Sequence, residues 1–252
     1  MSHLFKLPPG FVRRTSLALS WLALLALTGC ATGPNANPRD PLEPFNRGVY
    51  HLNDAIDRAV IKPVATAYRD VLPSPIRTGV NNFFSNLQDA WSAVNSALQL
   101  KGEAAANNLV RFGVNTFLGL GGVLDIASEM RIERHTEDFG QTLGHWGVGA
   151  GPYLVLPLLG PSTVRDTAAL PVDAQGNLMS GISDVATRNS ATALNLLDRR
   201  ARLLDATRLL DQVALDPYTF TRDAHLQRRR NSVYDGNPPD EDEPAASDIP
   251  TN

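Results

Sequence analysis

The chain has 252 residues, 43% of them hydrophobic, and its 23 basic and 26 acidic residues give a net charge of −3. This balance excludes the basic surface of a nucleic-acid-binding protein, so no nucleic acid is expected as a partner. Cys30 is the single cysteine, which excludes an internal disulfide and a thiolate-rich metal site.

The N-terminus predicts a lipoprotein signal peptide over residues 1–29. Three basic residues precede an apolar run over residues 16–27 (SLALSWLALLAL), which is too short to span a bilayer as a permanent helix. Small residues then lead to Cys30. We therefore expect cleavage before Cys30, acylation of its thiol and amine, and anchoring at about 0.8 kcal/mol per buried methylene. The alternative is an ordinary signal peptide with an incidental thiol.

Composition divides the remaining chain into three parts. Residues 30–39 are polar and rich in proline and glycine, which predicts a lipidated tether. Residues 235–252 are acidic and proline-rich, and we expect a disordered tail because they cannot bury enough apolar surface. A helical domain is predicted for residues 40–234. Its last basic run, residues 228–230 (RRR), is interpreted as a solvated helix end rather than as a contact for lipid phosphates.

Apolar residues spaced by three and four predict amphipathic helices over residues 45–60, 76–98 and 193–213. Pro63 should end or kink the first of them. Such apolar faces usually pack in a core, with charged residues such as Asp198 on the solvent side, and a lipid-facing surface is the alternative. No alternating run is long enough for a barrel strand, so the predicted class is all-α.

Two stretches lack charged residues, namely residues 139–164 (FGQTLGHWGVGAGPYLVLPLLGPSTV) and 112–124 (FGVNTFLGLGGVL). Glycines and prolines exclude one continuous transmembrane helix in the longer stretch. Irregular backbone at membrane depth must be buried in protein or line a wet cavity. The residues therefore fit a body sunk partly into a bilayer around a passage, or equally a soluble core with tight glycine turns.

Catalytic motifs are not found in the sequence. A phospholipase would need an activated nucleophile, and no Gly-x-Ser-x-Gly elbow occurs. His135 lies near Glu133 and Glu137, but the spacing matches no established metal motif. We therefore expect neither an enzyme nor a metal site.

A series of motifs resembles the MlaA (VacJ) family of outer-membrane phospholipid-transport lipoproteins. The resemblance covers nearly the whole body of the chain, from residue 40 to about residue 230. The matching motifs are residues 40–47 (DPLEPFNR), 82–87 (NFFSNL), 111–116 (RFGVNT), 119–125 (GLGGVLD), 138–144 (DFGQTLG), 147–153 (GVGAGPY), 156–157 (LP), 160–166 (GPSTVRD) and 216–218 (DPY).

The resemblance implies a ring-like body of amphipathic helices embedded in the inner, periplasm-facing leaflet of the outer membrane, often beside trimeric porins. An amphipathic channel would let phospholipids leave the outer leaflet and reach the periplasmic carrier MlaC, which maintains lipid asymmetry. No cofactor is implied apart from the covalent lipid on Cys30. Ala31 is similar to the residue that follows the lipidated cysteine in outer-membrane lipoproteins.

The resemblance also implies a mobile, glycine-rich gating loop beside the channel. A static tight turn is the alternative interpretation of the same glycines. The residues that match this loop are Gly147, Gly149, Gly151, Pro152 and Tyr153.

A second matching segment lies beside the tether. Phe45 and Asn46 correspond to family residues implicated in channel control, and the alternative is a simple helix start with Asn46 as the N-cap. At the level of function, the alternative to transport is a structural adaptor that binds porins. The uncharged glycine-rich stretches favour transport, because an adaptor does not need them.

Overall fold

The computed structural model describes residues 37–239. The signal peptide, Cys30, most of the tether and the tail from residue 240 lie outside the described residues. The predicted domain boundaries and the lipidation of Cys30 therefore stay predictions.

The described residues are mainly helical, in agreement with the predicted class. One short antiparallel hairpin interrupts the helices. In chain order the elements are α2 (Glu43–Ile56), the π-helix η1 (Asp57–Ile61), α3 (Lys62–Val71), α4 (Ser74–Leu98), α5 (Gly102–Phe117), α6 (Ile126–Glu129), α7 (Phe139–His145), β1 (Tyr153–Leu156), β2 (Gly160–Thr163), α8 (Val164–Gly176), the 3-10 helix η2 (Leu178–Gly181), α9 (Val185–Val213) and α10 (Pro217–Val233).

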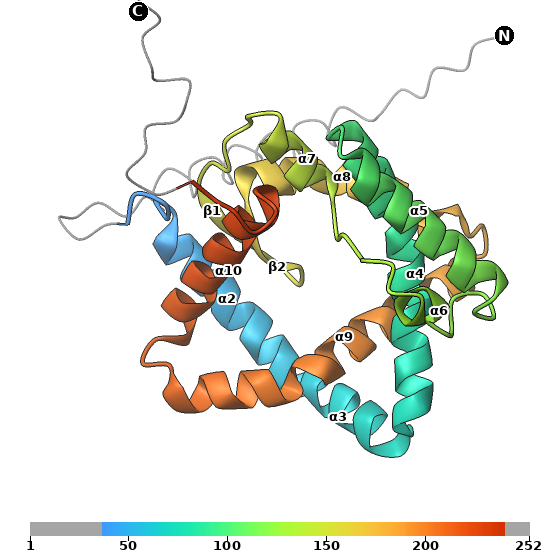
Figure 1. Cartoon of the computed structure of the whole chain (residues 1–252). Coiled ribbons are helices and arrows are strands. Elements are labelled where there is room, and N and C mark those ends of the chain that lie inside the picture. The colour runs from blue at the N-terminus through green and yellow to red at the C-terminus, as the bar shows by residue number, and fades with distance from the viewer. Residues whose placement is uncertain (1–36, 240–252) are drawn as a thin grey trace, which may run out of the picture.

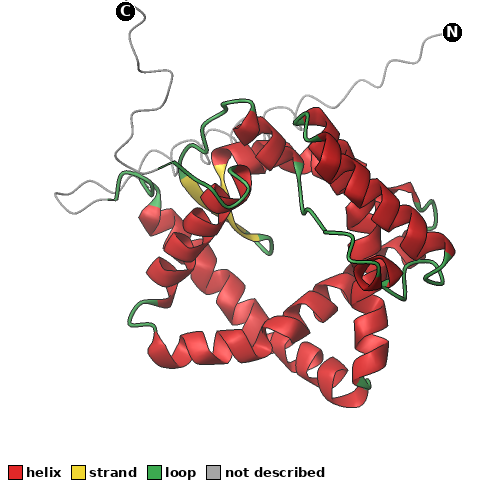
Figure 2. Cartoon of the chain, viewed as in Figure 1, coloured by secondary structure: helices red, strands yellow, loops and turns green. Residues whose placement is uncertain are grey.

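The helices follow one another around a ring, as Figure 1 shows. Helix α4 packs along the next helix α5, α7 packs along α8 after the hairpin, and α3 packs along α9, which comes from a distant part of the chain. The hairpin of β1 and β2 reaches from one side of the ring towards its middle (Figure 2). The predicted ring-like, all-α arrangement is confirmed, with the hairpin as an addition.

The uncharged stretch 139–164 is divided among several elements. It contains α7, a glycine-rich loop, the hairpin and the first residue of α8. Tyr153 pairs with Thr163 and Leu156 with Gly160 across the hairpin. Prolines and glycines obscured these four-residue strands in the sequence. Among the described residues, no helix has the length and apolar character needed to cross a membrane.

Pro63 does not end the first helical segment, so that part of the prediction is wrong. The backbone continues from α2 through η1 into α3, and Pro63 lies in the first turn of α3. The Lys62 amide donates to the Asp57 carbonyl, which is the wider spacing of a π-helix. The wider π-turn changes the hydrogen-bond spacing just before Pro63, which allows a residue without an amide donor to stand in a continuous helical segment.

The buried face of α4 is polar, contrary to the core interpretation of its apolar stripe. Ile76, Val94 and Leu98 of that stripe are exposed, although Phe84 is buried. Amide, hydroxyl and carboxylate side chains lie on the buried face instead. They are Asn86, Asp89, Ser92, Asn95 and Ser96.

A buried arginine organises this polar face. Arg111 of α5 is 1% exposed and lies 3.4 Å from Asp89 of α4 and 2.8 Å from Asp125 at the start of α6. Its guanidinium also donates to the Ile132 carbonyl at 2.6 Å. A buried charge is costly without partners, and this arginine satisfies two carboxylates and one carbonyl at once. It therefore joins α4, α5 and the segment that follows α6.

The core interpretation of α9 is confirmed only in part, because Leu204 packs with Ala65 in a buried cluster while other apolar residues of the stripe are exposed. Leu196, Leu203 and Val213 are exposed, whereas Asp198, expected on the solvent side, is buried. Asp198 accepts a hydrogen bond from the Tyr68 hydroxyl at 3.0 Å and forms an ion pair with Arg202 at 2.6 Å. The apolar face thus points outwards along much of α9.

Arg229 is not a solvated helix-end residue, which corrects the interpretation of residues 228–230. From α10 it contacts Asp138 at the start of α7 at 2.6 Å and Asp166 of α8 at 2.8 Å. Burial opposes the ionisation of both carboxylates, but the hydrogen bonds and charge of Arg229 prevail and hold their pKa values below the usual range. This cluster joins the last described helix to two earlier ones.

Replacing Arg111 by methionine should destabilise the ring, because the buried Asp89 would keep only Arg134, at 2.9 Å, and Asp125 and the Ile132 carbonyl would lose their guanidinium donor. We expect a loss of about 3–5 kcal/mol in the free energy of unfolding. The matched control is Arg58→Met, which removes an exposed pair with Asp54. Denaturant unfolding in detergent, followed by circular dichroism, measures the stability of both variants. Equal unfolding midpoints for Arg111→Met and Arg58→Met would contradict the assigned role of Arg111.

Candidate functional site

Two asparagines of α2 hold the hairpin. The Asn46 side chain donates to the Tyr153 carbonyl at 3.0 Å and accepts from the Val155 amide at 2.9 Å. Seven residues, or two helical turns, later, Asn53 donates to the Leu156 carbonyl at 2.9 Å and accepts from the Leu158 amide at 2.8 Å. Each side-chain amide thus pairs with the backbone as a neighbouring strand would. An isolated two-stranded hairpin is marginal in water, so these bonds stabilise it.

Asn46 is not an N-cap, and that alternative is wrong. Helix α2 begins at Glu43, with Leu42 at the N-cap position, and Asn46 is completely buried in the next turn. Its amide also donates to Asp40 at 2.8 Å. Phe45, the other residue predicted beside the tether, is exposed. A role in channel control stays a prediction for both residues.

Asp40 links the start of the domain to its last helix. The Tyr218 hydroxyl donates to Asp40 at 2.5 Å, and Arg222 contacts the same carboxylate at 3.2 Å. The Asn46 amide is its third partner. Burial and Asp40 together raise the pKa of Tyr218 well above its usual value, so the hydroxyl keeps its proton and donates it.

The hairpin carries apolar side chains at its tip. Leu158 and Leu159 are exposed, and Leu158 has a left-handed backbone conformation with φ of 64°. Since the hairpin reaches towards the middle of the ring, these leucines bring apolar surface to the ring interior. The sequence analysis did not select them or Asn53, because neither belongs to a recognisable motif.

Gly147 lies in a tight turn that ends α7. Its amide donates to the Gly144 carbonyl at 3.0 Å, and the Val148 amide donates to the Leu143 carbonyl at 2.9 Å. With φ of 90° at Gly147, this is a Schellman motif, which favours glycine at that position. At Gly147 the structure therefore shows the static turn. A Cβ atom there would contact nothing within 4 Å, so the surroundings also leave space for a mobile loop.

The other residues of the predicted gating loop have different surroundings. Gly149 has ordinary backbone geometry, and a Cβ atom there would contact nothing within 4 Å. A Cβ at Gly151, where φ is 67°, would lie 3.2 Å from Val164. Pro152 accepts from the Val164 amide, and Tyr153 is fully buried in β1. Arg165 donates to the carbonyls of Val148 and Ala150 on either side of Gly149, so Gly149 is the open position of the loop, and the gating role of the loop stays a prediction.

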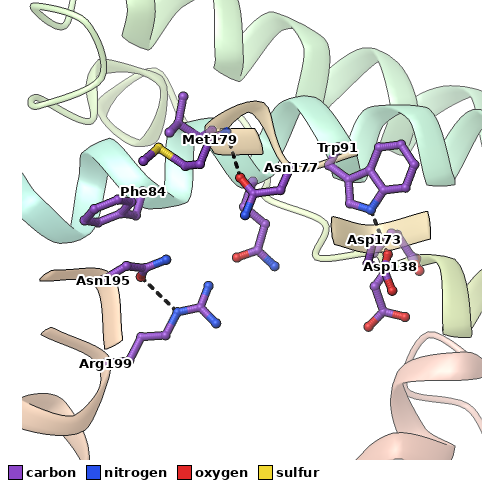
Figure 3. A pocket seen from close by; sticks show the side chains of 11 residues that line it. Phe84, Trp91, Asp138, Asp173, Asn177, Met179, Asn195 and Arg199 are labelled. Atoms are coloured by element: carbon purple, nitrogen blue, oxygen red, sulfur yellow. Dashed lines mark hydrogen bonds between the residues drawn. The ribbon is translucent and has the colours of Figure 1, made fainter. Parts of the chain in front are cut away.

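A hollow of about 240 Å³ lies between α4, the start of α7, α8 and α9 (Figure 3). Apolar and charged side chains share its wall, which makes it amphipathic. The lining residues are Phe84, Leu87, Gln88, Trp91, Glu137, Asp138, Asp173, Asn177, Met179, Asn195 and Arg199.

The histidines do not form a catalytic arrangement in residues 37–239. His135 contacts Asn107, and its backbone bonds the Asn108 side chain. Burial lowers the pKa of His225, which lies against the Tyr153 ring. No group of three or more potential metal ligands occurs in this part of the chain.

The fold and the site define a class of protein, namely a helical ring with a polar interior, an amphipathic hollow and apolar side chains exposed along its helices. A family model described as "MlaA lipoprotein" matches residues 38–232. The chain belongs to this family, and the resemblance seen in its motifs is confirmed.

Characterised relatives cover most of the chain. It is 40% identical over 222 residues to the "Intermembrane phospholipid transport system lipoprotein MlaA" of Escherichia coli K12, covering 84% of this chain and 87% of that protein. It is 33% identical to the protein of the same name from Haemophilus influenzae, covering 89% and 93%. A solved structure described as the "Structural basis for maintenance of bacterial outer membrane lipid asymmetry" matches with a TM-score of 0.69 at 36% identity, covering 79% and 99%.

Asn46→Ala should destabilise the protein more than Asn53→Ala. Asn46 is completely buried, and its loss removes one of the three partners of Asp40 and leaves the Tyr153 carbonyl and the Val155 amide of β1 without their side-chain partner, at about 1–3 kcal/mol for each buried group left unsatisfied. Asn53 is only half-buried, so we expect faster amide exchange at Leu158 with a smaller stability loss. Asn82→Ala, which removes one exposed bond to Val123, is the control. If the Leu158 amide exchanged at similar rates in Asn53→Ala and wild type, the assigned role of Asn53 in holding the hairpin would be contradicted.

Proposed function

We propose that this protein is a passive conduit that removes misplaced phospholipids from the outer leaflet of the outer membrane. The observation that carries the proposal is the inverted distribution of side chains, with polar groups buried between the helices and large apolar groups exposed. In water, exposed apolar area of this kind is unfavourable, and in lipid it is not. The names of its relatives support phospholipid as the transported molecule.

The most exposed of these apolar residues lie where helices end and turn. We propose that these turns contact the hydrocarbon of the inner leaflet. The residues concerned are Val71, Leu100, Phe117, Leu118, Leu120, Val213 and Leu215. Since no described helix has the length and apolar character to cross the bilayer, the ring would occupy one leaflet, with the lipid on Cys30 as a second attachment.

A conduit of this kind needs no bond chemistry and no cofactor. A phospholipid that changes leaflets must move a charged headgroup past hydrocarbon, which is costly without polar partners. A ring with polar groups inside and apolar leucines at the hairpin tip supplies surfaces for both parts of the molecule. We propose that the released lipid passes to the periplasmic carrier MlaC, and that a trimeric porin lies beside the ring.

The test of this proposal is the phospholipid content of the outer leaflet in cells that lack the gene. We expect an increase that the wild-type gene reverses and a Cys30→Ala gene does not, because the latter product lacks its anchor. Immunoblots of membrane fractions provide the control for protein level. An unchanged outer leaflet in the deletion strain would contradict transport and favour the porin adaptor.

The gating prediction is tested at Gly149, where the structure accommodates a side chain. Gly149→Val should fold like wild type but restrict the loop backbone, because a β-branched residue has fewer conformations than glycine. We expect the outer-leaflet phospholipid content to rise in cells carrying this variant. Gly147→Ala, by contrast, should lose about 1 kcal/mol of stability at its left-handed position. Normal lipid content with a well-folded Gly149→Val protein would contradict the gating role.

A further inference from the structure

A second hollow adjoins the amphipathic one. It measures about 610 Å³, and the side chains that line it are almost entirely apolar. Phe84 belongs to both hollows, and the consecutive residues Leu194 and Asn195 of α9 line one hollow each. The apolar hollow is lined by Pro75, Ile76, Gly79, Val80, Phe83, Phe84, Val123, Ala191 and Leu194. The amphipathic hollow and the apolar hollow thus meet at the Phe84 side chain.

Two charged groups of the amphipathic hollow have no ion-pair partner among the described residues. Arg199 makes one hydrogen bond, to the Asn195 side chain at 3.1 Å. Asp173 accepts from the Trp91 indole and from the Phe139 amide, both at 2.8 Å and both at the same oxygen, Oδ1. Figure 3 shows Arg199 and Asp173 on opposite sides of the hollow.

The remaining charges of this hollow are already neutralised. Glu137 pairs with Lys101 at 3.1 Å, and Asp138 pairs with Arg229. An incoming ligand would therefore meet one available cation and one available anion. Free phosphate would satisfy only Arg199, whereas a molecule with both charges would satisfy both residues.

The surroundings of Asp173 and of Arg199 disfavour the charged form of each side chain. Burial and the nearby Asp138 raise the pKa of Asp173, although the Phe139 amide and the Trp91 indole act in the other direction. Arg199 is open to the hollow, yet the protein around it and the neighbouring Arg202 lower its pKa. A ligand that brings an ammonium to Asp173 and a phosphate to Arg199 would remove both penalties.

We propose that the two hollows together hold a zwitterionic phospholipid, with its phosphate at Arg199, its ammonium at Asp173 and an acyl chain beside Phe84 in the apolar hollow. This inference rests on the proposed function and adds a headgroup preference to it. Phosphatidylethanolamine has the required phosphate and ammonium, and phosphatidylglycerol has the phosphate alone.

The experiment measures lipids bound to the full-length protein. Purified protein in detergent is mixed with equal amounts of phosphatidylethanolamine and phosphatidylglycerol, reisolated, and its bound lipids are quantified by mass spectrometry. We expect wild type to favour phosphatidylethanolamine. Arg199→Gln should bind about tenfold less of both lipids, since a hydrogen bond to a charged group contributes about 1.5–3 kcal/mol.

Asp173→Asn separates the two headgroups. The amide retains an oxygen to accept from Trp91 and Phe139 but loses the charge, so binding of phosphatidylethanolamine should fall towards that of phosphatidylglycerol. Arg208→Gln is the matched control, because Arg208 is exposed on the same helix and lines neither hollow. Glycerophosphoethanolamine, which has the head and no acyl chain, should not displace the bound lipid at equal concentration.

The outcomes distinguish this inference from the proposed function. If Arg199→Gln bound as much of each lipid as wild type does, the assignment of the phosphate to Arg199 would be overturned. An unchanged ratio of the two bound lipids in Asp173→Asn would overturn the headgroup preference. Displacement of the bound lipid by glycerophosphoethanolamine would overturn the assignment of an acyl chain to the apolar hollow. If wild type bound neither lipid while Arg208→Gln and wild type melted alike, the proposed function itself would fail.

Discussion

Polar groups buried between helices must find hydrogen-bond partners, and the ring depends on how this requirement is met. Arg111 binds carboxylates from two other elements, and Arg229 does the same at the other end of the domain. Asn46 joins Asp40 to the hairpin. In a medium of low dielectric such bonds are stronger than in water, and an unpaired group is correspondingly costly. The partners of Arg229 and of Asp40 come from distant parts of the sequence, so these bonds also close the ring.

The polar interior explains why the apolar side chains are exposed. When amides and ions occupy the space between helices, leucines such as Leu203 and Leu215 remain on the outside. Such a surface is unfavourable in water and would be favourable in a bilayer, in agreement with the proposed location. The same distribution that holds the helices together thus suits the ring to carry an amphipathic molecule between two environments.

The sequence predicted α2, α4 and α9, though not α5 or α8, because apolar spacing reports helical periodicity whether the apolar face meets protein or lipid. For the same reason, the spacing did not show which face of α4 and of α9 is buried, because it does not report whether water or lipid surrounds the helix. The family motifs identified Asn46 but not its bonds to β1. Asn53, Arg199 and Asp173 lie outside the quoted motifs, and only the fold shows which groups they face.

In the proposed arrangement the outer turns of the ring contact lipid while its interior hollow is wet. Single spin labels at Phe117 and at Asn195, in a Cys30→Ala background reconstituted into vesicles, test it directly. Collision with oxygen, which concentrates in hydrocarbon, is compared with collision with a water-soluble nickel complex. The account predicts that oxygen relaxes the label at residue 117 and nickel the label at residue 195. Preferential relaxation of the residue 117 label by nickel would contradict it.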